Sequence, residues 1–235
     1  MSLKPFKYSY PDYHEAIESA IFPGIRICEI GPSGNPSIKS SEIRRRNLDY
    51  TIIDVETIHW KDYNLEVNKH EVDLQRAMPD ELKNKFDLVI SQMVLEHIEQ
   101  PDPLHNHIAQ LLRYGGTAIH LYANPYSLSA LVNRLLPDFI GEFILDLVSN
   151  RDLSYDKKYP AFYNNCHTPS ERADLYFSKM SYSIKRHDAY AGHNYFQHVP
   201  VLRQLEVAYS RFLLKLRLFR LSTLSLLVLI RNNER

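Results

Sequence analysis

Residues 26–36 read Arg-Ile-Cys-Glu-Ile-Gly-Pro-Ser-Gly-Asn-Pro. The first five form a short apolar run of the kind found in buried strands, and the glycines and prolines behind it predict a tight loop. Asn35 and Pro36 suit the start of a helix, with the asparagine as N-cap and the proline in the first turn. A buried strand, a tight loop and a helix in this order predict the first unit of a parallel α/β sheet.

The same alternation continues along the chain. Helical patterns lie before the first strand and between later strands, and strands that alternate with helices predict βαβ units in a mostly parallel sheet. The further strand patterns are at residues 50–54, 72–73, 86–91, 117–122, 182–190 and 223–230. The helical patterns are near residues 13–20, 102–112, 127–136, 170–180 and 201–221.

The composition argues against several classes of protein. Lys and Arg together number 28, as do Asp and Glu, so the net charge is zero, whereas a nucleic-acid-binding protein usually carries a basic surplus. Cys28 and Cys166 are too few for a disulfide scaffold, and no cluster has zinc-ligand spacing. No secretory signal pattern opens the chain. We therefore expect a cytoplasmic protein with no metal and no nucleic-acid partner.

The loop at residues 31–36 is placed where parallel sheets bind ligands, beyond the carboxyl end of a strand. Glycine lets backbone amides approach a ligand closely, and Glu29 adds a negative charge that suits a cationic ligand better than a pyrophosphate. Gly31 and Gly34 do not match the G-x-G-x-x-G spacing of dinucleotide-binding loops, which argues against a nicotinamide-dependent enzyme. By itself, the loop also has the composition of an ordinary turn.

Two acidic residues follow neighbouring strands of the predicted sheet. Asp54 ends the strand at residues 50–54, where a carboxylate can accept hydrogen bonds from both hydroxyls of a ribose. Asp73, with Leu74, follows the weaker strand and is placed to face an adenine edge. The alternatives are that Asp54 caps the next turn and that Asp73 is a surface acid.

Taken together, these residues resemble the class I, seven-strand S-adenosylmethionine-dependent methyltransferases. The matching segments are residues 29–34, 53–54, 72–74, 86–98 (Phe-Asp-Leu-Val-Ile-Ser-Gln-Met-Val-Leu-Glu-His-Ile) and 112–117 (Leu-Arg-Tyr-Gly-Gly-Thr). The resemblance implies an α/β fold with a seven-strand, mostly parallel, Rossmann-like sheet, an antiparallel last strand, flanking helices and helical cap insertions. It also implies S-adenosyl-L-methionine as cofactor.

By the same resemblance, the acid before the loop lies near the amino-acid end of the methyl donor. The acid of the second strand binds the ribose, and the residues after the fourth strand line the floor of the site. The implied cofactor-binding residues are Glu29, Gly31, Pro32, Ser33, Gly34, Asp54, Val55, Asp73, Leu74, Ser91, Gln92 and Met93.

Ser33 and Pro36 depart from the family's usual three-glycine loop. A Gly-Pro-Ser-x-x-Pro loop resembles that of sugar and glycolipid methyltransferases, which implies O-methylation of a sugar or glycoconjugate. The alternatives are a non-catalytic relative that binds S-adenosylmethionine, or a methyltransferase for a small metabolite, a lipid or a protein.

We expect residues 1–235 to form a single methyltransferase domain in four parts. Residues 1–24 would form an N-terminal lid, residues 25–124 the cofactor-binding core, residues 125–181 an acceptor-cap insertion, and residues 182–235 a C-terminal strand, helix and strand.

The acceptor site is predicted in the second half of the chain. Residues 159–169 and 190–196 combine aromatic, amide and histidine side chains, the residue types that build sugar sites. The predicted acceptor contacts are Tyr163, His167, Tyr190, His193 and Tyr195. An alcohol acceptor must lose a proton, and the candidate bases are His97, His167 and His193. The alternative is a tyrosine-rich packing layer; His120, inside a strand, is expected to be a core histidine.

The helix at residues 201–221 is amphipathic and basic. Its apolar stripe comprises Leu202, Leu205, Tyr209, Phe212, Leu216 and Phe219. Lys215, Arg217 and Arg220 argue against a membrane-spanning helix, because charges in mid-bilayer are costly. The helix is expected either to cover the sheet or to contact the inner face of a membrane peripherally. The oligomeric state is not predicted.

Overall fold

The computed structural model describes residues 1–33, 35–56, 67–128, 130–131, 159–193 and 200–233. One sheet contains eight strands: β1 (Ser2–Pro5), β2 (Arg26–Ile30), β3 (Asp49–Asp54), β4 (Asn68–Glu71), β5 (Phe86–Gln92), β6 (Leu112–Ala123), β7 (Tyr182–Ala191) and β8 (Leu224–Arg231). The α-helices are α1 (Ser9–Ala20), α2 (Ser40–Arg46), α3 (Pro101–Leu111), α6 (Glu171–Lys179) and α7 (Pro200–Leu216). Short 3-10 helices are η1 (Phe6–Tyr8), η3 (Asp80–Leu82), η4 (Leu95–His97) and η5 (Phe219–Leu221).

The strands follow the order β1-β7-β8-β6-β5-β2-β3-β4. β8 runs antiparallel to both of its neighbours, β6 and β7, and the other pairs are parallel. The α/β fold and the antiparallel last strand are therefore confirmed, but the expected number of strands, seven, is too low. The eighth strand is β1, which pairs with β7 from within the segment expected to be a lid.

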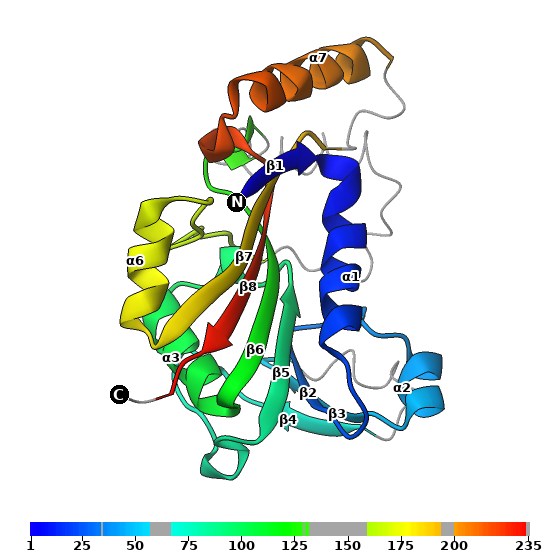
Figure 1. Cartoon of the computed structure of the whole chain (residues 1–235), viewed down its shortest axis with the longest axis vertical. Helices are drawn as coiled ribbons and strands as arrows, with labels where there is room; N and C mark the ends of the chain where they lie inside the picture. The colour runs from blue at the N-terminus through cyan, green and yellow to red at the C-terminus, as the bar shows by residue number, and fades with distance from the viewer. Residues whose placement is uncertain (34, 57–66, 129, 132–158, 194–199, 234–235) are drawn as a thin grey trace.

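Helices cover both faces of the sheet (Figure 1). On one face, Tyr13 and Ile17 of α1 and Ile43 of α2 pack on the sheet. On the other face, Leu104 of α3 and Phe177 of α6 do the same. Since the side chains of a parallel strand meet helix-covered faces on both sides, β2 and β5 are buried almost throughout, including the polar residues Glu29 and Asp87.

Three local expectations differ from the structure. The strand expected at residues 72–73 is β4, which ends just before them. β4 lies at the edge of the sheet, and its Asn-Lys-His-Glu sequence is polar, so apolar patterning did not mark its position. The strand expected at residues 117–122 begins earlier, at Leu112, so Gly115 and Gly116 lie inside β6. The loop after β2 continues to Lys39, the N-cap of α2, so Asn35 does not begin a helix.

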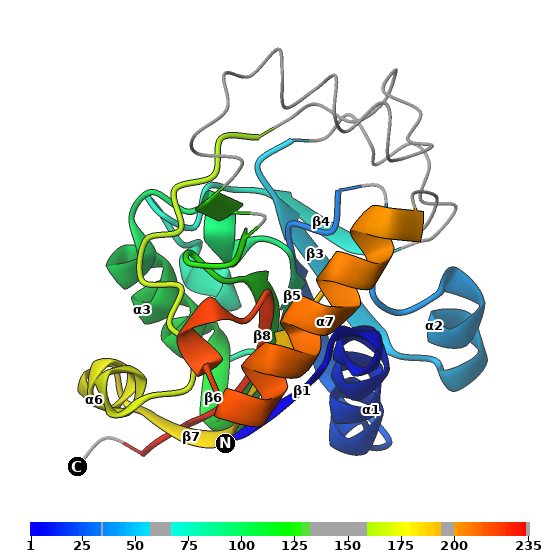
Figure 2. The same ribbon diagram turned by 90° about the horizontal axis from the view of Figure 1, so that it is seen from above.

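α7 lies at the end of the molecule, beside β1 and β7, as both views show (Figures 1 and 2). The helix expected at residues 201–221 corresponds to α7 followed by η5, which forms a separate last turn. Most of the helix expected near residues 127–136 lies outside the described residues. Within the described part of the chain, no helix has both the length and the apolar character needed to cross a bilayer.

Candidate functional site

The carboxyl ends of four neighbouring strands, β5, β2, β3 and β4, meet at one edge of the sheet, which we call the carboxyl edge. Because adjacent parallel strands end side by side, residues far apart in sequence are brought together there. All the predicted cofactor residues lie in or directly after these strands, except that Gly34 is outside the described residues.

The loop after β2 turns sharply at Gly31, whose φ is +60°. The Gly31 amide donates to the Ile53 carbonyl at 2.8 Å, so the loop begins against the end of β3. A Cβ atom at this position would lie 2.9 Å from Cγ2 of Val94. Glycine is therefore required here both by the backbone conformation and by the close approach of the segment after β5.

Glu29 lies below this loop and is buried. Its carboxylate accepts hydrogen bonds from the Ser37 amide at 2.8 Å, the Ser37 hydroxyl at 2.5 Å and the Tyr50 hydroxyl at 2.5 Å. Burial raises the pKa of Glu29, and these hydrogen bonds oppose the rise. The carboxylate thus ties the far arm of the loop to β3, a positioning role that the sequence did not reveal.

Asp54 faces the same loop from the end of β3. Its carboxylate accepts from the Ser33 amide at 3.1 Å and from the Glu56 amide at 3.2 Å, one on each oxygen. Burial raises the pKa of Asp54, and backbone amides oppose the rise. Since each carboxylate oxygen can accept more than one hydrogen bond, Asp54 retains capacity to bind hydroxyl groups.

The remaining predicted cofactor residues differ in exposure. Asp73 accepts from the Gln75 amide at 2.9 Å and remains partly exposed, whereas the Leu74 side chain is in the core. Ser91 is buried and lies 2.8 Å from Nδ1 of His120, which is the core histidine that the sequence predicts. Any contribution of Ser91 to a site on this edge would therefore come from its backbone.

Residues 159–168, which we call the strap, cross the carboxyl edge. At one end, the Tyr159 hydroxyl donates to the Glu56 carboxylate after β3 at 2.7 Å. Farther along, the Phe162 and Tyr163 amides donate to the Glu96 carbonyl after β5 at 2.8 and 2.9 Å. The strap therefore connects the ends of β3 and β5, and β2 with its loop lies between them.

His97 contacts the strap directly. Its Nδ1 lies 2.9 Å from the Pro160 carbonyl, and its ring meets the Tyr159 ring edge-on at 6.1 Å. Since a carbonyl oxygen can only accept, Nδ1 carries the hydrogen and Nε2 of the neutral ring is left as a proton acceptor. This tautomer is the one that a general base on the partly exposed face of His97 would need.

The other predicted acceptor residues lie in different surroundings. The backbone carbonyl of His167 accepts a hydrogen bond from the Tyr122 hydroxyl at 2.6 Å. The His167 ring packs on the Tyr176 ring with 4.9 Å between their centres, and burial lowers the pKa of His167. His193 follows β7, where its amide donates to the Glu206 carboxylate at 2.7 Å. Burial lowers the pKa of His193, and Glu206 opposes this.

Tyr190 requires a correction, and Tyr195 cannot be placed. The Tyr190 side chain is buried on the α1 face of the sheet, where its hydroxyl donates to Asp12 at 2.8 Å. It is a packing residue in this structure, as the tyrosine-rich alternative proposes, and is not accessible to an acceptor. Tyr195 lies outside the described residues.

Glu96 is a candidate functional residue that the sequence analysis did not single out. It is 2% exposed, and among the described residues neither carboxylate oxygen has a hydrogen bond of good geometry. Burial raises its pKa to about 8, although the backbone amides of Glu96 and Ala123 oppose the rise. Buried carboxyls with strongly shifted pKa values are concentrated at functional sites. The sequence Leu95-Glu96-His97 gives no sign that the Glu96 carboxyl lacks hydrogen bonds, so this residue could not be identified from the sequence.

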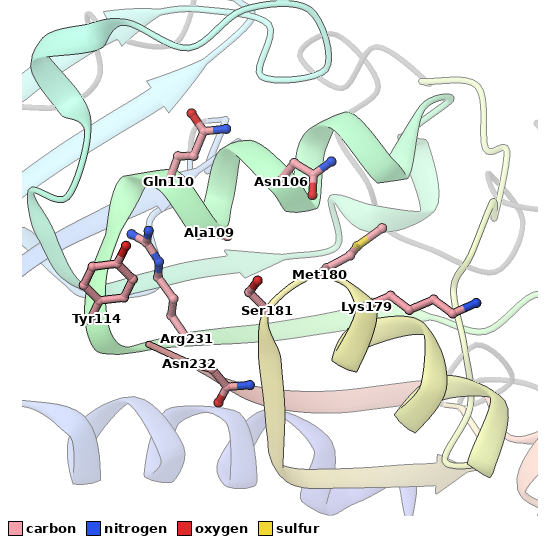
Figure 3. A pocket seen from close by; sticks show the side chains of 9 residues that line it. All are labelled: Asn106, Ala109, Gln110, Tyr114, Lys179, Met180, Ser181, Arg231 and Asn232. Atoms are coloured by element: carbon pink, nitrogen blue, oxygen red, sulfur yellow. The ribbon is translucent and has the colours of Figure 1, made fainter. Parts of the chain in front are cut away.

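A separate hollow of about 270 Å³ lies at the opposite end of the sheet, between α3, the start of β7 and the end of β8 (Figure 3). Arg231 points into this region, with its guanidinium 4.2 Å from the centre of the Tyr114 ring. None of the predicted site residues lines this hollow. Its position at the amino ends of the parallel strands separates it from the carboxyl edge.

Comparison with protein families identifies one match: the model of the methyltransferase domain matches residues 7–204. A search of curated proteins found no match. Solved structures share the fold, among them an S-adenosylmethionine dependent methyltransferase from Mesorhizobium loti, with a TM-score of 0.54 and 13% identity over 92% of this chain and 96% of that one.

Two other structures are similar. A putative S-adenosylmethionine dependent methyltransferase from Listeria monocytogenes has a TM-score of 0.57 and 10% identity over 97% of this chain and 100% of that one. Phosphoethanolamine N-methyltransferase 2 of Haemonchus contortus, in complex with S-adenosyl-L-methionine, has a TM-score of 0.55 and 13% identity over 95% of this chain and 53% of that one. At these identities the likeness concerns the fold.

Proposed function

Because the chain belongs to the methyltransferase domain family, we propose that it transfers a methyl group to a hydroxyl of a sugar or glycoconjugate. The coarser statement is established: the chain is an enzyme, and its methyl donor is S-adenosylmethionine. The proposal concerns the acceptor, the residues that bind both substrates and the group that removes the proton.

The carboxyl edge fits the donor. The left-handed turn at Gly31 exposes loop backbone beside Asp54, and the Asp54 carboxylate retains acceptor capacity for the two ribose hydroxyls. In our proposal the loop holds the methionine part, the end of β3 the ribose, the segment after β4 the adenine, and the segment after β5 the floor. The contacting residues would be Glu29, near the amino-acid end of the donor, and Gly31, Pro32, Ser33, Gly34, Asp54, Val55, Asp73, Leu74, Ser91, Gln92 and Met93.

The single observation that favours a sugar-type acceptor is the position of the strap. Its anchors at Glu56 and Glu96 lie after β3 and β5, and in our proposal its aromatic and amide side chains face the donor bound between them. Tyr163, which is half-buried, would provide a ring face, and the adjacent Asn164, whose amide nitrogen donates to the Glu99 carbonyl at 2.9 Å, would provide its amide oxygen to a sugar hydroxyl. We accordingly assign residues 125–181 to an acceptor cap.

Methyl transfer requires little of the protein beyond the alignment of donor and acceptor. S-adenosylmethionine supplies a methyl group on a sulfonium with a good leaving group, so positioning the acceptor is the main requirement. The acceptor hydroxyl must still lose its proton, and Nε2 of His97 is available to receive it because Nδ1 donates to Pro160. Glu96, buried next to His97 in the chain, is the second group that could hold a proton here.

The test is to incubate the purified protein with S-adenosylmethionine and a panel of free, nucleotide-linked and lipid-linked sugars. We expect S-adenosylhomocysteine together with a product one methyl group heavier, and we expect His97→Gln to lose turnover while donor affinity is retained. The same substitution at His167 and at His193 tests the two other histidines. Methylation of amine acceptors only would overturn the sugar proposal, and donor binding without turnover on any acceptor would favour a non-catalytic relative.

An acceptor attached to a lipid is favoured by one further feature. α7 is basic and amphipathic, and it follows β7 at the same end of the sheet as the carboxyl edge. A peripheral membrane contact through residues 201–221 would bring such an acceptor to this end of the molecule.

A further inference from the structure

One face of α7 is apolar and exposed to solvent. Val201, Leu205, Phe212 and Leu216 are 69%, 63%, 52% and 52% exposed, and Ala208 is exposed between them. The spacing of these five residues, at i, i+4, i+7, i+11 and i+15, places them along one stripe of an α-helix. Large apolar side chains gathered in this way on a surface mark an interaction site.

A different face of α7 holds the helix to the domain. Leu213 is fully buried, the Ser210 hydroxyl donates to the Ala191 carbonyl at 3.0 Å, and Glu206 accepts from the His193 amide at 2.7 Å. These contacts explain why the helix is ordered without its stripe being covered. The exposed stripe is therefore not the surface that fixes α7 to the sheet.

The charges around the stripe are one-sided. Glu206 is the only acid in α7, and it faces the domain. Arg211 and Lys215, both exposed, lie along one border of the stripe by helical spacing. Arg217 and Arg220 follow the end of the helix, so the region around the stripe is cationic.

Neighbouring residues extend this surface. The Arg220 guanidinium lies 4.3 Å from the centre of the Tyr126 ring, and the Asn124 amide side chain donates to the Ser222 hydroxyl at 2.7 Å. These contacts hold the segment after β6 against η5, which follows α7. Tyr126 and Leu128, which are 41% and 46% exposed, add apolar area beside the cations.

We propose that the stripe of α7 docks on an anionic lipid surface. An exposed apolar stripe with a cationic border is the pattern of helices that lie in the plane of a membrane, with the apolar side chains inserted and the cations at the headgroups. A protein partner would need to supply a complementary acidic, apolar groove, whereas an anionic bilayer offers both properties at once. The docking deepens the peripheral membrane contact of the proposed function by assigning it a surface and a lipid class, and it can be measured without donor or acceptor.

The test is co-sedimentation of the full chain with phosphatidylcholine vesicles that do or do not contain phosphatidylglycerol. We expect binding to the anionic vesicles, weaker binding in high salt and little binding to pure phosphatidylcholine. The double variant Leu205→Glu, Phe212→Glu should bind the anionic vesicles with an affinity that is lower by about tenfold or more. Leu175→Glu is the matched control, because Leu175 is 64% exposed on α6 and should tolerate the change with no loss of binding.

Three results would overturn the proposal: no binding to anionic vesicles, unchanged binding by the double variant, or a concentration-dependent dimer that the double variant converts to a monomer. The last result would show that a second copy of the chain covers the stripe. Donor binding, measured by calorimetry on the same samples, verifies that the variants are folded. It also separates failure of membrane docking from failure of the proposed methyl transfer.

Discussion

The hydroxyl of Tyr159 lies 2.7 Å from the carboxylate of Glu56, which joins the strap to the chain just after β3. The sequence separation of 103 residues makes this a tertiary contact that closes one side of the carboxyl edge. The opposite side is closed by the two strap amides on the Glu96 carbonyl. A donor bound on this edge would therefore lie beneath the strap, which predicts that the strap affects how firmly the donor is held.

Tyr159→Phe should weaken donor binding by about 1 kcal/mol, because it removes one hydrogen bond to a carboxylate that is not fully buried. Titration calorimetry with S-adenosylhomocysteine measures the change. Tyr190→Phe is the matched control: it removes a 2.8 Å hydrogen bond to the carboxylate of Asp12 in α1, and neither residue belongs to the strap. Equal losses in the two variants would indicate general loosening and contradict a role of the strap.

Asp54→Asn should weaken donor binding by about 1–3 kcal/mol, because the ribose hydroxyls would lose a charged acceptor. Asp87→Asn provides the control at the opposite end of the sheet. Asp87 is also a nearly buried carboxylate at a strand and accepts from the Arg26 amide at 2.7 Å. We expect the Asp87 variant to lose stability with unchanged donor affinity; an Asp54 variant with full affinity would show that the ribose is bound elsewhere.

The sequence predicted the parts of the fold that depend on local pattern. β2 and β5 are buried almost throughout, and the apolar residues within them make their positions visible in the chain. β1 and β4 are four-residue edge strands with polar or proline-containing sequences, and edge pairing does not require apolar alternation. The extension of β6 through Gly115 and Gly116 also depends on pairing with strands distant in sequence.

The position of the candidate site was predictable for a related reason. Parallel strands place their following loops together, so Gly31 and Asp54 could be assigned to one edge from their order in the chain. The partners of single side chains could not be assigned in this way. That Glu29 is satisfied by Ser37 and Tyr50, while Tyr190 is turned toward Asp12, depends on packing between elements.

Glu96 should make stability fall as the pH rises. Burial raises its pKa from an ordinary value of 4.5 to about 8, so between these values the folded chain keeps a proton that the unfolded chain releases. The free energy of unfolding then decreases with pH by up to about 1.4 kcal/mol per unit. Glu96→Gln, which cannot ionise, should lack this decrease in urea denaturation at pH 5 to 8. Parallel curves for both proteins would contradict the shifted pKa.

The buried histidines should have the opposite effect on stability in acid. Burial lowers the pKa values of His105 and His187 to about 4 and that of His120 to about 3, so these rings stay neutral when folded and take up protons when unfolded below pH 6.5. The free energy of unfolding should therefore decrease as the pH is lowered from 6.5 to 4, by up to about 1.4 kcal/mol per pH unit for each ring. His187→Gln should reduce this slope, and the same change at exposed His14 should not.

Gly31 and Gly24 allow steric contact to be separated from backbone strain. Both have positive φ, +60° and +77°, but a Cβ at Gly31 would lie 2.9 Å from Val94, whereas a Cβ at Gly24 would meet nothing within 4 Å. Gly24→Ala should therefore cost about 1 kcal/mol of unfolding free energy, from the conformation alone. Gly31→Ala should cost more and also weaken donor binding, because the loop must shift away from Val94. Adding Val94→Ala to Gly31→Ala should restore part of the stability, and denaturation of the four proteins including wild type measures each step. If the two alanine variants lose equal stability and Val94→Ala gives no recovery, the close approach of the segment after β5 is not what requires glycine in the loop.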